Sequence, residues 1–377
     1  MLCLALILIL SCKRSQDPKI SDPVSNDSSL ELTYAEGFSV INKDEYRTLT
    51  IANPWPNSDR TFVYALVDRK VAPKISLMSE QYDGIIVTPV ASIVVTSTTH
   101  IPSLELLDVH DKLIGFPGTN YISSLSTRRR IEDGKVHELG KNEGINTEVL
   151  LNIKPEVVIG FGVESANKTY NVIQNANIPV IYNGDWTESS ALAKAEWIKF
   201  FGVLFDKEQE ADSIFKSIEL NYLKAKQIAL EVKTKPSILS GAMHKDVWYL
   251  PNGSSGEAQL LKDANTNYLW SDTDGAGSLA LSFESVFEKA KDADLWFSPS
   301  YYTSLEQLEK ANPHYTKFKA FKDKKVYSFS LTKGETGGVL YYEQGMSRPD
   351  LVLKDIIKIC HPELLTKYDT YFFKQLK

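Results

Sequence analysis

Short β-branched runs alternate with helix-forming segments along most of this chain, and this alternation restricts the fold more than any other feature. The first such stretch predicts strands at residues 92–96, 112–115, 157–159 and 179–181. Helices are predicted between them, at residues 102–109, 147–153 and 164–175. Because short apolar strands separated by helices form parallel sheets that are covered on both faces, the sequence predicts an α/β fold.

The alternation resumes after Lys235-Pro236 and predicts a second unit of the same kind. Strands are expected at residues 238–239, 247–250, 295–297 and 326–329, and helices at 256–264, 283–290 and 348–359. Segments 146–159 and 282–297 are also alike: each has a cap residue, a glutamate two places later, a short helix and a strand. This similarity favours two related lobes.

The two stretches are separated by a segment that predicts one long helix. Residues 206–231 contain no Pro or Gly, and their apolar side chains form a helical stripe at Ala211, Ile214, Phe215, Ile218, Tyr222, Ala225 and Ala229. Asp206 is expected to cap the first turn, with Gln209 reaching back to it. Such a helix is about 39 Å long and forms a stiff strut rather than a hinge loop.

The first residues predict an export signal. Residues 1–11 are apolar, but they are too few to span a bilayer, which takes roughly 20 residues. Ile9-Leu10-Ser11-Cys12 resembles a bacterial lipobox, so we expect cleavage before Cys12 and acylation of its thiol. A polar tether would follow, and the segment made of signal and tether would end at residue 31. Residues 34–67 would then add strands to the first lobe. The predicted domains are residues 32–185, 186–232 and 233–377.

Composition and missing motifs exclude several classes of function. The formal net charge of −6 argues against a nucleic-acid partner. The chain has no phosphate-binding Gly-rich loop, no Gly-x-Ser-x-Gly motif and no His-Glu-x-x-His motif, so we expect neither catalysis nor a cofactor. Its six histidines are scattered, which predicts no metal bound directly by the protein. Cys3 would be removed with the signal and Cys12 would carry lipid, so Cys360 would have no partner and no disulfide is expected.

Aromatic and hydroxyl-rich loops follow several predicted strands and are the candidate ligand-binding residues. In open α/β sheets, ligands bind beyond the carboxyl ends of the strands, and flat aromatic faces with a few polar groups suit a bulky, partly apolar ligand. Arg128, in the run Arg128-Arg129-Arg130, could bind the carboxylates of a chelate. The other candidates are Thr98, His100, Trp186, Trp248, Tyr249, Tyr301 and Tyr341.

From Ser92 onward the order and spacing of several segments resemble the substrate-binding lipoproteins of bacterial ABC importers for iron chelates, haem and cobalamin. The segments include 93–100, 140–148 with 154–159, 263–265, 282–284, 293–296 and 348–353. The resemblance implies two Rossmann-like lobes with mainly parallel sheets, joined by one long helix, with a ligand cleft between them. It also implies that Glu148 and Glu284 dock on arginines of the permease.

The resulting expectation is a monomeric binding protein, lipid-anchored on the periplasmic side of the cell envelope. Its partners would be a small metal chelate or tetrapyrrole, and an ABC permease with its ATPase. Two alternatives stay open: a surface lipoprotein that scaffolds another protein, and a chelatase-like enzyme on the same two-lobed scaffold. The enzyme would need convergent histidines and carboxylates in the cleft, for which His100 and His244 are the candidates.

Overall fold

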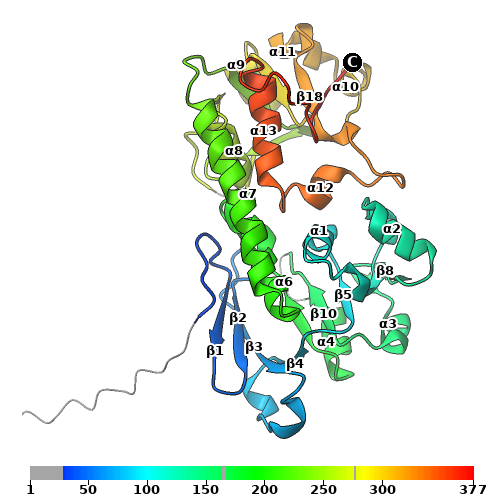
Figure 1. The fold of residues 1–377 in the computed structure, drawn as a ribbon. Coiled ribbons are helices and arrows are strands. Elements are labelled where there is room, and N and C mark those ends of the chain that lie inside the picture. The colour runs from blue at the N-terminus through cyan, green and yellow to red at the C-terminus, as the bar shows by residue number, and fades with distance from the viewer. Residues whose placement is uncertain (1–28, 164–166, 276) are drawn as a thin grey trace, which may run out of the picture.

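Two α/β lobes lie end to end along one long helix (Figure 1). The computed structural model describes residues 29–163, 167–275 and 277–377. The predicted signal segment and Cys12 therefore lie outside the described residues. The predicted fold class, two lobes with mainly parallel sheets, is confirmed.

The first lobe is built on a five-stranded parallel sheet with strand order β11-β10-β5-β6-β7. Every side chain of Ile93–Val95 is buried, as the apolar runs predict for a strand covered on both faces. The strands are β5 (Ile93–Val95), β6 (Leu113–Phe116), β7 (His137–Glu138), β10 (Val157–Gly160) and β11 (Val180–Tyr182). A small antiparallel pair, β8 (Gly140–Lys141) with β9 (Gly144–Ile145), lies beside them.

Four short helices connect the strands of this sheet: α1 (Ile101–Leu106), α2 (Leu125–Glu132), α3 (Thr147–Ile153) and α4 (Lys168–Asn175). The predicted bounds of α3 match the structure. Helix α4 begins at Lys168, later than predicted, because Asn167 caps it by accepting the backbone N–H of Thr169.

The predicted strand extension before Ser92 forms a separate four-stranded sheet. Its strands are β1 (Phe38–Asn42), β2 (Arg47–Ala52), β3 (Thr61–Asp68) and β4 (Gly84–Thr88), with β3 and β4 parallel. The Phe38 ring packs on Trp197 at a centroid distance of 4.7 Å. The sheet therefore shares a core with the helices that lead to the strut.

The connection between the lobes consists of α5 (Ala191–Glu196), α6 (Ile198–Leu204) and α7 (Glu208–Ala229). Helix α7 is unbroken over 22 residues, about 33 Å, and it packs on α6 in the first lobe and on α13 in the second. Except for Ile214, which is half-buried, the predicted apolar stripe is buried. The predicted strut is therefore present, two residues shorter at each end.

The predicted capping box at the start of α7 is wrong. Asp206 has a positive φ of 53°, and the helix begins after Lys207 with no side-chain cap. The carboxylate of Asp206 instead pairs with the Arg47 guanidinium at 3.1 Å. Asp206 lies in the turn that ends α6, where the Lys207 N–H donates to the carbonyl of Gly202, and the ion pair links this turn to the added sheet.

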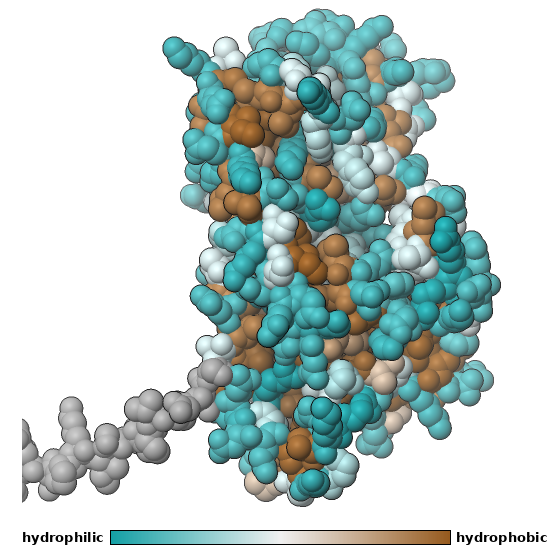
Figure 2. All heavy atoms as spheres, viewed as in Figure 1, coloured by the Kyte–Doolittle hydropathy of each residue, from teal (hydrophilic) through white to brown (hydrophobic). Residues whose placement is uncertain are grey.

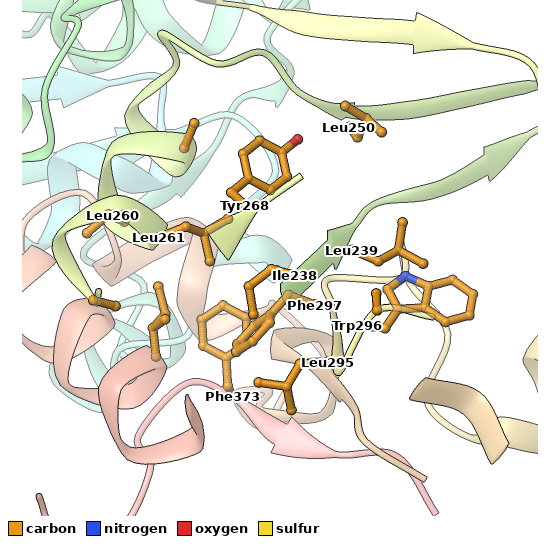
Figure 3. Close-up of a cluster of buried hydrophobic side chains, with 14 of the residues drawn as sticks. Ile238, Leu239, Leu250, Leu260, Leu261, Tyr268, Leu295, Trp296, Phe297 and Phe373 are labelled. Atoms are coloured by element: carbon orange, nitrogen blue, oxygen red, sulfur yellow. The ribbon is translucent and has the colours of Figure 1, made fainter. Parts of the chain in front are cut away.

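The second lobe repeats the architecture of the first. Its main sheet has strand order β15-β12-β17-β18-β19, parallel except for β19. The strands are β12 (Ser237–Ser240), β15 (Asn267–Tyr268), β17 (Leu295–Phe297), β18 (Val326–Ser328) and β19 (Lys374–Gln375). Figure 3 shows the core beneath this sheet, where Ile238, Leu295 and Phe297 face Phe373.

Residues 247–250, predicted as part of the alternation, belong to a different sheet. A three-stranded antiparallel sheet contains β13 (Ala242–His244), β14 (Val247–Pro251) and β16 (Ser278–Leu281). The tight turn after His244 reverses the chain before a helix can form, so β14 pairs with its neighbour β13.

The helices of the second lobe are α8 (Gly256–Asp263), α9 (Phe283–Ala290), α10 (Leu305–Ala311), α11 (Lys319–Lys322), α12 (Leu340–Gln344) and α13 (Pro349–Cys360). The surface in Figure 2 is largely hydrophilic, with scattered hydrophobic patches. Among the described residues, no helix is both long enough and apolar enough to cross a membrane.

Candidate functional site

Three adjoining cavities lie where parallel strands end, and together we call them the interlobe cleft. The first, the outer cavity, has a volume of about 480 Å³ and is bounded by both lobes. Loops after β5, β6 and β10 form its first-lobe wall together with the β8–β9 hairpin. The opposite wall is formed by residues before α12 and by Tyr342 on that helix. Its lining is Thr96–Thr98, Phe116–Gly118, Tyr121, 140–143, Phe161, Gly338, Val339 and Tyr342.

The second, the inner cavity, has a volume of about 250 Å³ and lies closer to the helices that connect the lobes. Thr99, Ala191 and Lys194 line it from one side. The other side is formed by α8 and α12, with mostly apolar surface. These second-lobe residues are Gly256, Glu257, Leu260, Tyr341, Tyr342, Gly345 and Met346.

The third, the second-lobe cavity, has a volume of about 220 Å³ and follows the ends of β12, β17 and β18. It is lined by Ser240, Ser298, Ser300 and Phe329, by the hairpin residues Met243, His244 and Tyr249, and by Tyr301. Tyr342 borders all three cavities, and Glu257 borders the inner and second-lobe cavities. The Tyr342 side chain is therefore the point at which the three cavities meet.

Four of the predicted ligand-binding residues line this cleft. Thr98 borders the outer cavity, Tyr341 the inner one, and Tyr249 and Tyr301 the second-lobe cavity. Tyr249 and Tyr301 are exposed, at 44% and 68% of their surface, so their rings are open to a ligand. Thr98 and Tyr301 follow the parallel strands β5 and β17, as expected for residues that meet at one edge of a sheet. Tyr249 instead lies on the antiparallel strand β14, and Tyr341 lies on α12.

Trp248 is not a cleft residue. It is fully buried in the second-lobe core, where its ring stacks on Trp296 at 5.6 Å and its Nε1–H donates to the carbonyl of Ser240. The alternation along β14 explains the difference: Trp248 points to the core, and Tyr249, the next residue, points away from it.

Arg128 does not face the cleft either. Its side chain is 9% exposed, and its guanidinium donates to the carbonyl of Thr119 at 2.7 Å. Arg130 similarly donates to the carbonyls of Asp111 and Leu113. These arginines satisfy backbone acceptors within the first lobe, because α2 places them against loop carbonyls.

His100 is sealed behind the cleft wall. It is 1% exposed, its ring packs on Phe201 at 5.6 Å, and desolvation lowers its pKa to about 3. Its Nε2 lies 4.0 Å from Asp185 Oδ2, and neither ring nitrogen has a hydrogen-bond partner in the described part of the chain. At neutral pH this histidine is uncharged and contacts no cavity described above.

Trp186 is half-buried against the first-lobe core, and it lines none of the three cavities. Its neighbour Asp185 is buried beside the cleft wall, where it accepts from the Thr99 hydroxyl at 3.5 Å. Burial raises the pKa of Asp185 to about 6, while Lys194 acts in the opposite direction. The Asp185 carboxylate is thus directed toward Thr99.

Sequence reasoning missed Lys194 and Glu257 as cleft residues, and from the run Tyr341-Tyr342-Glu343 it selected Tyr341 rather than Tyr342. Desolvation lowers the pKa of Lys194 and raises that of Glu257, and each residue's charge opposes the effect on the other. Glu257 is the second residue of α8, after the N-cap Ser255. From sequence alone, a glutamate in the first turn is interpreted as a residue that stabilises its helix, because no local feature shows that this helix start faces a cleft.

No three His, Cys, Asp or Glu side chains are grouped to hold a metal ion anywhere in residues 29–163, 167–275 and 277–377. His244 borders the second-lobe cavity together with Glu257, whereas His100 is enclosed. The two histidines considered for an enzyme therefore do not converge on one cavity.

The two predicted docking glutamates occupy equivalent positions. Glu148 is the second residue of α3, which Asn146 caps, and Glu284 is the second residue of α9, which Ser282 caps. Both glutamates are exposed. The repeated pattern seen in the sequence thus corresponds to two capped helix starts, one in each lobe.

Comparisons with known proteins agree with this architecture. The chain is 27% identical over 373 residues to an uncharacterized lipoprotein of Methanocaldococcus jannaschii, covering 93% of this chain and 87% of the relative. Its fold is similar to that of a periplasmic heme binding protein from Pseudomonas aeruginosa, with a TM-score of 0.57 and 15% identity over 76% of this chain and 98% of the other.

A second solved structure gives the same result. The ABC-type Fe³⁺-hydroxamate transport system from Saccharomonospora viridis matches with a TM-score of 0.53 and 15% identity, over 72% of this chain and 93% of the other. The family model of the periplasmic binding proteins matches residues 93–330, a span that includes the first main sheet, the strut, most of the second main sheet and part of the cleft. This chain therefore belongs to the periplasmic binding protein family.

Proposed function

We propose that this protein captures an iron complex, haem or a cobalamin in the interlobe cleft and delivers it to an ABC permease. The observation that carries the proposal is the cleft itself: loops from the carboxyl ends of two parallel sheets enclose adjoining cavities lined by tyrosines and hydroxyl side chains. Such a lining offers large flat faces and a few polar groups to a bulky ligand. The names of the similar solved structures support this class of ligand.

Delivery would use the two exposed helix starts. Glu148 and Glu284 lie on different lobes, at the same position of a capped helix. Two carboxylates so placed can each bind an arginine of a permease in bidentate fashion. We propose them as the docking residues.

The protein would act on the outer side of a membrane, held by lipid on Cys12. The relative from Methanocaldococcus jannaschii is named a lipoprotein, which supports this part of the proposal. Cys12→Ser should release the mature protein from membranes and leave ligand affinity unchanged. A variant that still partitions with membranes, or a mature protein without lipid mass on Cys12, would exclude the anchor.

Ligand capture is tested with purified protein and three probes: a ferric trihydroxamate, haemin and cyanocobalamin. At a free concentration of 100 times the dissociation constant, a true ligand stabilises the fold by roughly 2.7 kcal/mol, seen as a raised melting temperature. Native mass spectrometry should show one bound molecule. The proposal fails if none of the probes shifts the melting temperature or adds mass.

A pair of tyrosine variants locates the site. Tyr342→Ala removes the side chain shared by the three cavities and should weaken binding about tenfold or more. Tyr82→Ala serves as the control, because Tyr82 pairs with the Tyr46 hydroxyl in the added sheet, remote from the cleft. Equal losses in both variants would place the ligand elsewhere.

A further inference from the structure

The inner cavity contains two opposite charges that do not pair with each other. Lys194 on α5 and Glu257 on α8 both line it, from the connecting helices and from the second lobe. The ammonium lies beside the start of α8: a β-carbon at Gly256 would be 4.0 Å from Lys194 Nζ. Among the described residues, neither group has a hydrogen bond or an ion pair within 4.0 Å, although the charges of Asp185 and Glu188 also act on Lys194.

The positions of these two charges leave both of them accessible to a ligand. Glu257 is exposed and Lys194 is half-buried, and both side chains line the cavity. Desolvation there raises the pKa of Glu257 and lowers that of Lys194. Their charges are therefore available to whatever enters the cavity.

The rest of the cleft is also balanced in charge. The outer cavity has one cation and one anion on its wall, Lys141 and Glu143. No arginine borders any of the three cavities in the described part of the protein, because Arg128 and Arg130 donate to backbone carbonyls. A site built for a polyanionic chelate would need a surplus of cations, preferably arginines in bidentate geometry.

We propose that the cleft selects an uncharged or internally charge-balanced ligand, with Glu257 rejecting anions and Lys194 rejecting cations. The inference rests on the proposed capture of a metal complex or tetrapyrrole and names its charge class. Interactions between charges are several times stronger in a partly enclosed cavity than in water. A ligand with a net charge is attracted by one of the two groups and repelled by the other, so the cavity offers little net attraction to offset the hydration that the ligand loses.

The test uses two ferric chelates of different charge: an uncharged trihydroxamate complex and a tris-catecholate complex with a net negative charge. Affinities are measured by quenching of tryptophan fluorescence for the wild-type protein, Glu257→Gln and Lys194→Gln. Wild-type protein should bind the uncharged complex at least about tenfold more tightly. Glu257→Gln should reduce this preference about tenfold, and Lys194→Gln should increase it.

Glu284→Gln is the matched control. Glu284 is the second residue of α9, as Glu257 is of α8, and both helices have eight residues and a serine N-cap. The two glutamine variants lose the same helix-dipole interaction, but only Glu257 faces the cleft. Glu284→Gln should keep the wild-type preference.

The two chelates differ in shape as well as charge, so the decisive result is the direction in which each variant moves the preference. Opposite shifts for Glu257→Gln and Lys194→Gln support the inference, since a structural role would weaken both chelates together. It is overturned if the anionic complex binds as tightly as the uncharged one, or if the variants shift the preference in the same direction. Binding of neither complex to any variant would refute the proposed capture of iron chelates as well.

Discussion

The backbone N–H of Ser123 donates to Glu343 Oε2 at 2.5 Å, joining the two lobes across 220 residues of sequence. Ser123 immediately precedes the N-cap of α2 in the first lobe, and Glu343 lies on α12 in the second. The Ser123 hydroxyl adds a bond to the carbonyl of Gly338 at 3.0 Å. Both side chains are buried, so the lobes are in direct contact beside the cleft.

This contact predicts a specific dependence of stability on pH. Burial raises the pKa of Glu343 from 4.5 to about 7, the Ser123 N–H lowers it, and the charge of Glu105 raises it further. The contribution of Glu343 is therefore full below about pH 4.5 and is lost as the pH rises through about 7. Glu343→Gln should abolish this loss, a relative gain of about 1–3 kcal/mol at pH 8.

Urea unfolding of both proteins between about pH 5 and pH 8 gives the measurement. Asp185, whose pKa burial raises to about 6, contributes a loss of the same sign in both proteins and cancels in the comparison. Parallel stability curves for the wild-type protein and Glu343→Gln would contradict the prediction.

Variants of two adjacent residues of β14 should differ in effect, one lowering stability and the other weakening ligand binding. Trp248→Ala opens a cavity in the second-lobe core and should cost about 3–5 kcal/mol of stability. Tyr249→Ala removes an exposed cleft ring and should change stability by roughly 0.5 kcal/mol or less, while weakening ligand binding. Thermal unfolding and binding titrations measure the two effects, and the reverse pattern would mean that Trp248 faces the ligand.

Permease docking predicts loss of transport without loss of binding. The double variant Glu148→Lys, Glu284→Lys should keep the wild-type dissociation constant, because neither residue lines the cleft. Uptake of a radiolabelled complex by cells that carry the variant should fall at least about tenfold. Glu306→Lys, at the same position of the capped helix α10, is the control for helix-dipole loss. Uptake that survives the double reversal would rule out docking through these residues.

The continuous strut predicts little movement between the lobes when ligand binds. Helix α7 packs on both lobes without a break, so closure would have to bend it or separate it from α6 or α13. Spin labels at Lys135→Cys and Lys310→Cys, in a Cys360→Ser background, report the distance between the lobes. We expect one distance distribution that is nearly unchanged by ligand, and two well-separated populations would indicate a hinge.

Local sequence determined the elements with regular patterns. The runs Ile93–Val95 and Leu295–Phe297 are entirely apolar and became buried strands, because a parallel sheet covered on both faces buries every side chain of such a run. Asn146 and Ser282 became N-caps, because their side chains accept backbone N–H groups within three residues. These interactions are short-range, so the sequence contains all the information they need.

The composition of the cleft depended on contacts that local sequence does not encode. Asp206 has the residue type of a helix cap, but Arg47, far away in the chain, holds it in an ion pair. Trp248 and Tyr249 are both plausible ligand residues, and only the packing of β14 on the main sheet placed one inside and one outside.

Sequence alone thus determined the apolar strands at the centre of both main sheets, the N-caps Asn146 and Ser282 and the apolar stripe of α7, since each follows from periodicity or a nearby hydrogen bond. Tertiary structure alone decided that Lys194 and Glu257 share a cavity, that Tyr342 joins three cavities and that His100 is enclosed. The physical reason is that burial and electrostatic environment are set by residues distant in sequence, which become neighbours only when both lobes pack against α7.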